Sequence, residues 1–179
     1  MLKSVPVRLF HAHYKEAISL LKTAFPKEEM MPVGMLKRIA HRRYVSFMAY
    51  EDDGKFVGLS YAWSSDHEVF VLYLAVNPKI RSKGYGSRIL QQIQKDHPGK
   101  EITLNIEPVV DTAANYQQRL KRLKFYEKNG FHETGYVLGE DGDEYSILST
   151  GSHFSIEEYR RTIGLVRFGS TMPETRKIA

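Results

Sequence analysis

The sequence of 179 residues contains no cysteine. This absence excludes disulfides, a thiol nucleophile and thiolate metal sites, and it is typical of a cytoplasmic protein. No apolar run approaches the roughly 18 residues of a membrane-spanning helix, and no charged-then-apolar leader opens the sequence. We therefore expect neither a membrane span nor a signal peptide, and a cytoplasmic location.

Metal-ligand spacing is also missing. Seven histidines are scattered along the chain, and the pair His11 and His13 does not fit a ligand pattern. The net charge of +5 would suit a nucleic-acid partner, but the basic residues do not alternate with aromatic ones on one stripe. They gather in 79–88, which suits an anionic cofactor, and in 119–128, which is typical of a solvated helix face. We expect no metal and no nucleic-acid partner.

Two common phosphate-binding patterns, G-x-G-x-x-G and G-x-x-x-x-G-K-[ST], do not occur. What is present is an apolar strand, Phe70–Val76, then a turn with Gly84 and Gly86, then an amphipathic helix. The glycines let successive backbone N–H groups point the same way without a Cβ in between. The helix N-terminus adds partial positive charge. The stretch predicts an anion-binding turn, and a simple change of chain direction is the alternative.

A second motif lies downstream, where Tyr126 is followed by Gly130 and Phe131. The Arg-x-x-Gly-x-Gly turn of 81–86 together with this Tyr-x-x-x-Gly-Phe helix end resembles the GNAT superfamily of acyl-CoA-dependent N-acetyltransferases. The resemblance implies acetyl transfer from acetyl-CoA, as cosubstrate, to a primary amine of a small molecule or peptide. A non-catalytic acyl-CoA-binding sensor or interaction module is the alternative.

The fold implied is α+β: a mixed, mostly antiparallel, twisted sheet of about six to seven strands flanked by helices. We expect residues 1–150 to form the acetyltransferase domain, 151–169 a helical extension packed on it, and 170–179 a disordered tail. The extension begins with a capping box at Ser155–Glu158. Its helix could also cover a substrate groove or meet a partner chain, which leaves a homodimer open.

Cofactor residues are carried over from the family motif. Main-chain groups of Leu74, Ala75 and Val76 would bind the pantetheine arm of CoA as an added strand. The pyrophosphate would bind the turn, which consists of Arg81, Ser82, Lys83, Gly84, Tyr85, Gly86 and Ser87.

Tyr126 matches the family's tyrosine that donates a proton to the departing thiolate, with a core aromatic residue as the alternative. A primary amine with a pKa of about 10.4 must also lose a proton before it attacks. Glu107, which follows the fifth strand, is the candidate base, and an exposed turn glutamate is the alternative. Glu68 is a second choice. Many relatives have an asparagine and an alanine before this tyrosine, where this sequence has Arg119 and Arg122. The role of the asparagine is therefore not carried over to any residue.

Relatives build the acceptor pocket from the first two helices, the loop between them and the late hairpin. Those segments supply here Phe25, Met30, Met31, Val33, Met35 and Tyr136, with Glu28 and Glu29 nearby. This apolar, adaptable lining favours a hydrophobic or peptide-like amine over a polyamine.

Overall fold

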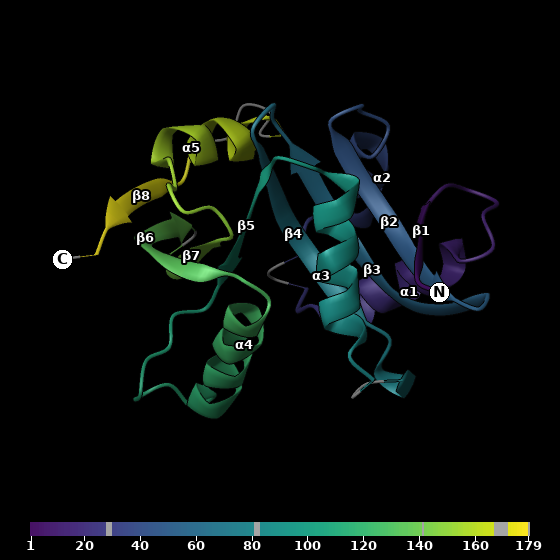
Figure 1. Ribbon diagram of the computed structural model, residues 1–179, viewed down its shortest axis with the longest axis horizontal. Helices are drawn as coiled ribbons and strands as arrows, with labels where there is room; N and C mark the ends of the chain where they lie inside the picture. Colours follow the sequence, from purple (N-terminus) through teal and green to yellow (C-terminus); the bar gives the residue numbers. More distant parts are fainter. Residues whose placement is uncertain (28–29, 81–82, 141, 167–171, 179) are drawn as a thin grey trace. The chain divides into compact units, whose positions relative to one another are not determined.

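The computed structural model describes residues 1–27, 30–80, 83–140, 142–166 and 172–178 (Figure 1). The elements follow one another as β1 (Lys3–Pro6), α1 (Tyr14–Ala24), α2 (Val33–Ile39), β2 (Val45–Asp52), β3 (Lys55–Ser64), β4 (Glu68–Val76), the 3-10 turn η1 (Pro78–Ile80), α3 (Tyr85–Asp96), β5 (Glu101–Ile106), α4 (Tyr116–Lys128), β6 (His132–Glu140), β7 (Asp143–Ser149), α5 (Ile156–Gly164) and β8 (Glu174–Lys177). None of the helices in these ranges is long and apolar enough to cross a membrane.

The strands form one eight-stranded sheet in the order β1-β2-β3-β4-β5-β7-β6-β8. β4 and β5 pair in parallel, because helix α3 carries the chain from one end of the sheet back to the other. The pairs β1–β2, β2–β3, β5–β7, β6–β7 and β6–β8 are antiparallel. The predicted mixed, mostly antiparallel sheet is therefore confirmed.

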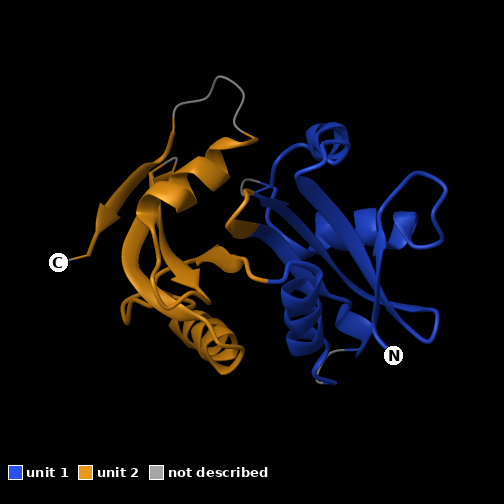
Figure 2. Ribbon diagram, turned by 45° about the horizontal axis from the view of Figure 1, so that its top comes forward, with its two compact units in different colours: residues 1–64, 71–98 blue, residues 65–70, 99–179 orange. Residues whose placement is uncertain are grey.

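The chain divides into two compact units, coloured separately in Figure 2. Unit 1 comprises residues 1–64 and 71–98, and unit 2 comprises residues 65–70 and 99–179. The sequence suggested a domain over 1–150 with a helical extension, 151–169, packed on it, and this division stays a prediction. In the structure that helix, α5, belongs to unit 2. Its Tyr159 is fully buried, and the tyrosine hydroxyl donates a 2.9 Å hydrogen bond to Asn105 Oδ1 on β5.

In unit 1, helix α3 packs on β3 at very short range. Ile89, Leu90 and Ile93 of the helix are buried, spaced so that they share one face. A Cβ on Gly58 of β3 would lie 2.5 Å from the carbonyl oxygen of Ala75 and 2.8 Å from Ile89 Cδ1. Only glycine permits this approach, which lets both α3 and the end of β4 lie close to β3.

The chain end departs from its prediction. Glu174–Lys177, inside the segment expected to be disordered, forms β8 and pairs with β6. Its backbone gains ladder hydrogen bonds, and Arg176 forms a 2.6 Å ion pair with Glu144. A four-residue polar edge strand carries no hydrophobic alternation, so nothing in its sequence indicates a strand.

Candidate active site

The glycine turn leads directly into α3 in unit 1. Gly84 is the N-cap residue and has φ 72°, in the left-handed region that glycine occupies without strain. Residues 83–87 thus lie at the start of a 12-residue helix, where unpaired N–H groups and the helix dipole favour an anion. Two predicted residues of the turn, Arg81 and Ser82, lie outside the described residues.

Arg88, on the first turn of α3, is already engaged. Its Nη1 donates a 2.8 Å hydrogen bond to Asp52 Oδ2, and its guanidinium lies 4.9 Å from the centre of the Tyr85 ring. The Tyr85 hydroxyl donates to the same Asp52 oxygen at 3.1 Å. Arg88 holds the pKa of Asp52 well below its usual range. Asp52 was not among the residues expected at the site, because in the sequence it stands only as part of the turn between β2 and β3.

The end of β4 carries the residues predicted to bind pantetheine. Ala75 is buried, while Leu74 and Val76 are partly exposed. Pairing of β4 with β5 covers only Glu68–Phe70 and Glu101–Thr103. Asn77 ends the strand, because its side chain donates to the Phe56 carbonyl at 3.1 Å and accepts a bond from the Lys79 N–H.

Tyr126 lies in the last turn of α4, in unit 2, and the residues of its motif hold it there. Its carbonyl accepts hydrogen bonds from the N–H groups of Asn129 and Phe131, at 2.9 and 3.1 Å. Gly130 has φ 87°, which lets the chain reverse at the helix end. The buried Phe131 ring then packs edge-on against Tyr126, with centroids 5.5 Å apart.

The hydroxyl of Tyr126 makes no hydrogen bond to any residue in the described part of the chain. Burial raises the pKa of Tyr126 to about 12, and the charge of Arg122 opposes that rise. The group therefore keeps its proton at neutral pH and has it available for an acceptor. This is the state that a general acid needs before the reaction.

Glu107 follows β5 and is held by α4. Arg119 Nη2 lies 2.9 Å from Glu107 Oε1, and Arg122 Nη1 lies 2.9 Å from Oε2. Partial burial alone would raise the pKa of Glu107, but the hydrogen bond from Asn115 and the two arginine charges hold that pKa below its ordinary value. A lowered pKa makes Glu107 a weaker base.

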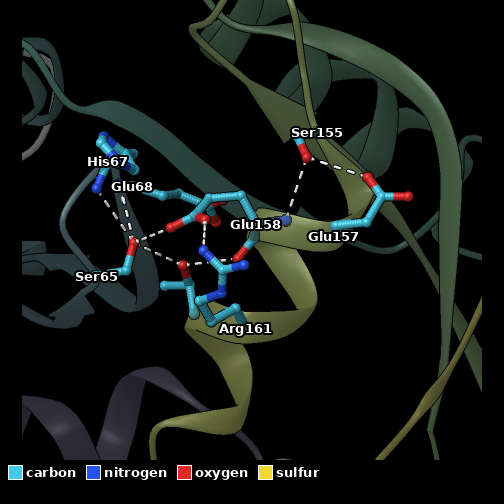
Figure 3. A network of polar contacts seen from close by, with 8 residues as sticks. Ser65, His67, Glu68, Ser155, Glu157, Glu158 and Arg161 are labelled. Carbon is cyan, nitrogen blue, oxygen red and sulfur yellow. Dashed lines mark hydrogen bonds and ion pairs between the residues drawn. The ribbon is translucent and has the colours of Figure 1, made fainter.

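Glu68, the second candidate base, is 2% exposed at the start of β4. Thr103 Oγ1 donates a 2.5 Å hydrogen bond to it. Burial raises the pKa of Glu68 to about 8, with smaller contributions from the charges of Glu101 and Glu158, against the hydrogen bond from Thr103. Figure 3 shows the polar network beside it, in which Ser65 Oγ donates a 2.6 Å bond to Glu158 of α5.

The residues expected to line the acceptor pocket fall in both units. In unit 1, the Phe25 ring lies 4.7 Å from that of Tyr73, and the Met31 N–H donates a 2.9 Å bond to the Tyr73 hydroxyl. These contacts tie the segment between α1 and α2 to β4. Tyr136, in unit 2, packs on Phe154 instead. Glu28 and Glu29 lie outside the described residues.

The family comparison gives these features their context. Residues 43–133 match the family model described as an acetyltransferase (GNAT) domain. The chain belongs to the GNAT acetyltransferase family. The matched range of this GNAT protein includes the end of β4, the glycine turn, Glu107 and Tyr126. No curated protein sequence matches the chain.

Solved structures share the fold. A protein of Bacteroides thetaiotaomicron assigned to the GNAT family is 24% identical, over 89% of this chain and 91% of that one, with a TM-score of 0.72. An aminoglycoside 6'-N-acetyltransferase complexed with coenzyme A is 15% identical, over 87% and 99%, with a TM-score of 0.63. Naa50 of Arabidopsis thaliana, complexed with the bisubstrate analogue CoA-Ac-MVNAL, is 17% identical over 84% and 98%, with a TM-score of 0.58.

Proposed function

We propose that this GNAT protein transfers the acetyl group of acetyl-CoA directly to a primary amine of a small molecule or peptide, with Tyr126 as general acid. The observation that carries the proposal is the state of Tyr126. Its family motif is complete, its ring is fixed by Phe131, and its hydroxyl is protonated and makes no hydrogen bond within the described residues.

Acetyl-CoA would bind through two sets of groups in unit 1. Main-chain groups of Leu74, Ala75 and Val76 would hydrogen-bond to the pantetheine amides, as in strand addition. The turn Arg81–Ser87 would hold the pyrophosphate. The positive φ of Gly84 and the helix that starts behind it support the second assignment.

In the reaction, the neutral amine attacks the thioester carbonyl carbon, and the C–S bond breaks as the amide forms. The nitrogen releases one proton to water in this step, and Tyr126 regains a proton from water after it has protonated the sulfur. The sulfur leaves as a thiolate, which Tyr126 stabilises by donating its O–H proton. A free thiol has a pKa of about 8.5, well below that of Tyr126. Proton transfer therefore becomes favourable to the extent that the thiolate is also removed from water, because burial raises a thiol's pKa.

The acceptor must lose a proton, and Glu107 is a weak base for this step. An α-amino group, with a pKa near 8, is neutral in about one molecule in ten at pH 7, against about one in 2,500 for a lysine-like amine. An α-amine therefore needs less help from a base. Together with the apolar residues around Tyr73, this favours a peptide-like or hydrophobic amine over a polyamine.

The test is CoA release by the purified protein with a panel of peptides, amino acids, hydrophobic amines, aminoglycosides and spermidine. Tyr126→Phe should then lower kcat by roughly 10²–10⁴ and leave the Kd for acetyl-CoA nearly unchanged. An unchanged kcat in Tyr126→Phe would show that Tyr126 is not the general acid. Micromolar binding of acetyl-CoA without turnover of any amine would favour a sensor instead.

A further inference from the structure

Both oxygens of the Glu107 carboxylate already accept hydrogen bonds, and each of them faces an arginine. Oε1 accepts from Arg119 and from Asn115 Nδ2, the latter at 3.2 Å, and Oε2 accepts from Arg122. A general base must accept the substrate's proton directly or through one water. Proton uptake by Glu107 would remove the negative charge that both arginine contacts depend on, and so would weaken them. Its geometry is that of a structural anchor.

Arg119 extends this anchor to both ends of the loop between β5 and α4. Besides Glu107, its Nη1 donates a 2.9 Å bond to the Pro108 carbonyl, and its Nε donates a 2.7 Å bond to Asn115 Oδ1. Asn115 is the N-cap residue of α4, yet its side chain makes no capping bond to the first turn of the helix. The side chain joins the cluster around Glu107 instead.

Helix α4 depends on such polar contacts because it buries little apolar surface. Of its thirteen residues, Leu123 is the one that is buried. A helix of this length is marginal without tertiary packing. Arg122, paired with Glu107, lies four residues before Tyr126 and so on the same helical face, where its charge acts on the tyrosine.

We propose that Glu107 is a positioning residue: through Arg119 and Arg122 it holds α4, and with it the hydroxyl of Tyr126, in the place that protonation of the leaving thiolate requires. The inference rests on the proposed role of Tyr126. It assigns the two arginines, which replace the family's asparagine and alanine, a common function.

The first test is a double-mutant cycle between Glu107→Gln and Arg122→Gln, with kcat, KM and the pH profile of each variant. Each single change should lower kcat about tenfold while KM for acetyl-CoA changes by less than about threefold, and the double variant should be little worse than either. The pH profile of kcat/KM should keep its shape in Glu107→Gln. Glu127→Gln and Lys124→Gln, exposed positions on α4, are matched controls that should leave kcat unchanged.

The second test does not require turnover. Amide hydrogen exchange should become faster in residues 109–119 of Glu107→Gln and stay at the wild-type rate in Glu127→Gln. If no amine is acetylated by the wild type, the proposed function fails while this measurement still tests the anchor. The inference would be overturned if amide exchange in Glu107→Gln stayed at the wild-type rate, or if the two substitutions lowered kcat independently, so that their effects multiply in the double variant. It would also be overturned if the pH profile of Glu107→Gln lost its acidic limb, a result that would make Glu107 the base.

Discussion

The hydroxyl of Thr103 donates a 2.5 Å hydrogen bond to the carboxyl group of Glu68, from β5 to the neighbouring parallel strand β4. In the register of this pair Thr103 lies opposite Phe70, two residues after Glu68, so the bond runs diagonally between the strands. Thr103 is fully buried and Glu68 nearly so. A neutral carboxyl group satisfies this site, whereas an ionised one would be a buried charge with no cationic partner in the described part of the chain.

Glu68 should therefore make the protein less stable as the pH rises. Its pKa is about 8 when folded, against the ordinary 4.5 expected in the unfolded chain, so between those values the folded state binds a proton that the unfolded state has lost. The free energy of unfolding then falls with pH, by up to about 1.4 kcal/mol per unit from this group. Urea unfolding of wild type and Glu68→Gln at several pH values between about 5 and 8 measures the difference.

Glu68→Gln should gain stability relative to the wild type as the pH is raised, because glutamine keeps an oxygen acceptor for Thr103 and never ionises. Glu133→Gln, an exposed position on β6, is the control and should track the wild type at every pH. A constant difference between Glu68→Gln and the wild type would mean that Glu68 is already ionised at pH 5.

Gly58→Ala should destabilise unit 1. The added methyl group would meet the Ala75 carbonyl and the end of the Ile89 side chain, and a backbone oxygen cannot move aside cheaply. Such overpacking costs roughly 1–3 kcal/mol. Gly34→Ala is the control, because no atom lies within 4 Å of its ideal Cβ, and a helix gains about 0.5–1 kcal/mol from that change. Equal midpoints for Gly58→Ala and wild type in urea would contradict the close approach of α3.

Gly130→Ala should lower kcat by more than its effect on stability explains. Its φ of 87° strains any residue with a Cβ, at a cost of about 1–2 kcal/mol, and relief of that strain would move Phe131 off the Tyr126 ring. Gly135→Ala has a similar φ of 77° in the same unit and should be destabilised alike with unchanged kcat. Thermal unfolding measures the backbone strain in each variant, and kcat measures whether Tyr126 is still positioned. Equal kcat values for Gly130→Ala and Gly135→Ala would show that the motif does not position Tyr126.

Local sequence patterns predicted many of the helices and strands. They predicted little of the pairing between polar residues that lie far apart in the sequence. The strand before the glycine turn and the helix behind it are specified by residues adjacent in sequence, so β4 and α3 were expected. The partnership of Asp52 with Arg88 joins positions 36 residues apart, and a hairpin turn of acidic residues gives no sign of it. Glu107 was singled out by its place after β5, but the arginines that engage it were visible only as a departure from the family pattern.

Asp52→Asn should strengthen the binding of acetyl-CoA. Asp52 is a carboxylate beside the N-terminal turn of α3, and it neutralises Arg88 directly. Removal of its charge leaves the arginine free to attract an anion, so the Kd should fall about two- to fivefold at low salt. Screening should shrink the gain as ionic strength rises, because the exposed part of the interaction decays within a Debye length of about 8 Å at physiological salt.

Titration calorimetry at two salt concentrations measures this effect, with Asp53→Asn as the neighbouring control. Asp53 is far more exposed than Asp52 and makes no contact with Arg88 among the described residues, so its replacement should change the Kd less. Weaker binding of acetyl-CoA by Asp52→Asn would contradict the view that Asp52 opposes cofactor binding. Asp52 would then hold Arg88 and Tyr85 in the orientation that the phosphate groups need. Loss of binding in both variants would point to damage of the hairpin between β2 and β3, which circular dichroism and thermal unfolding would reveal.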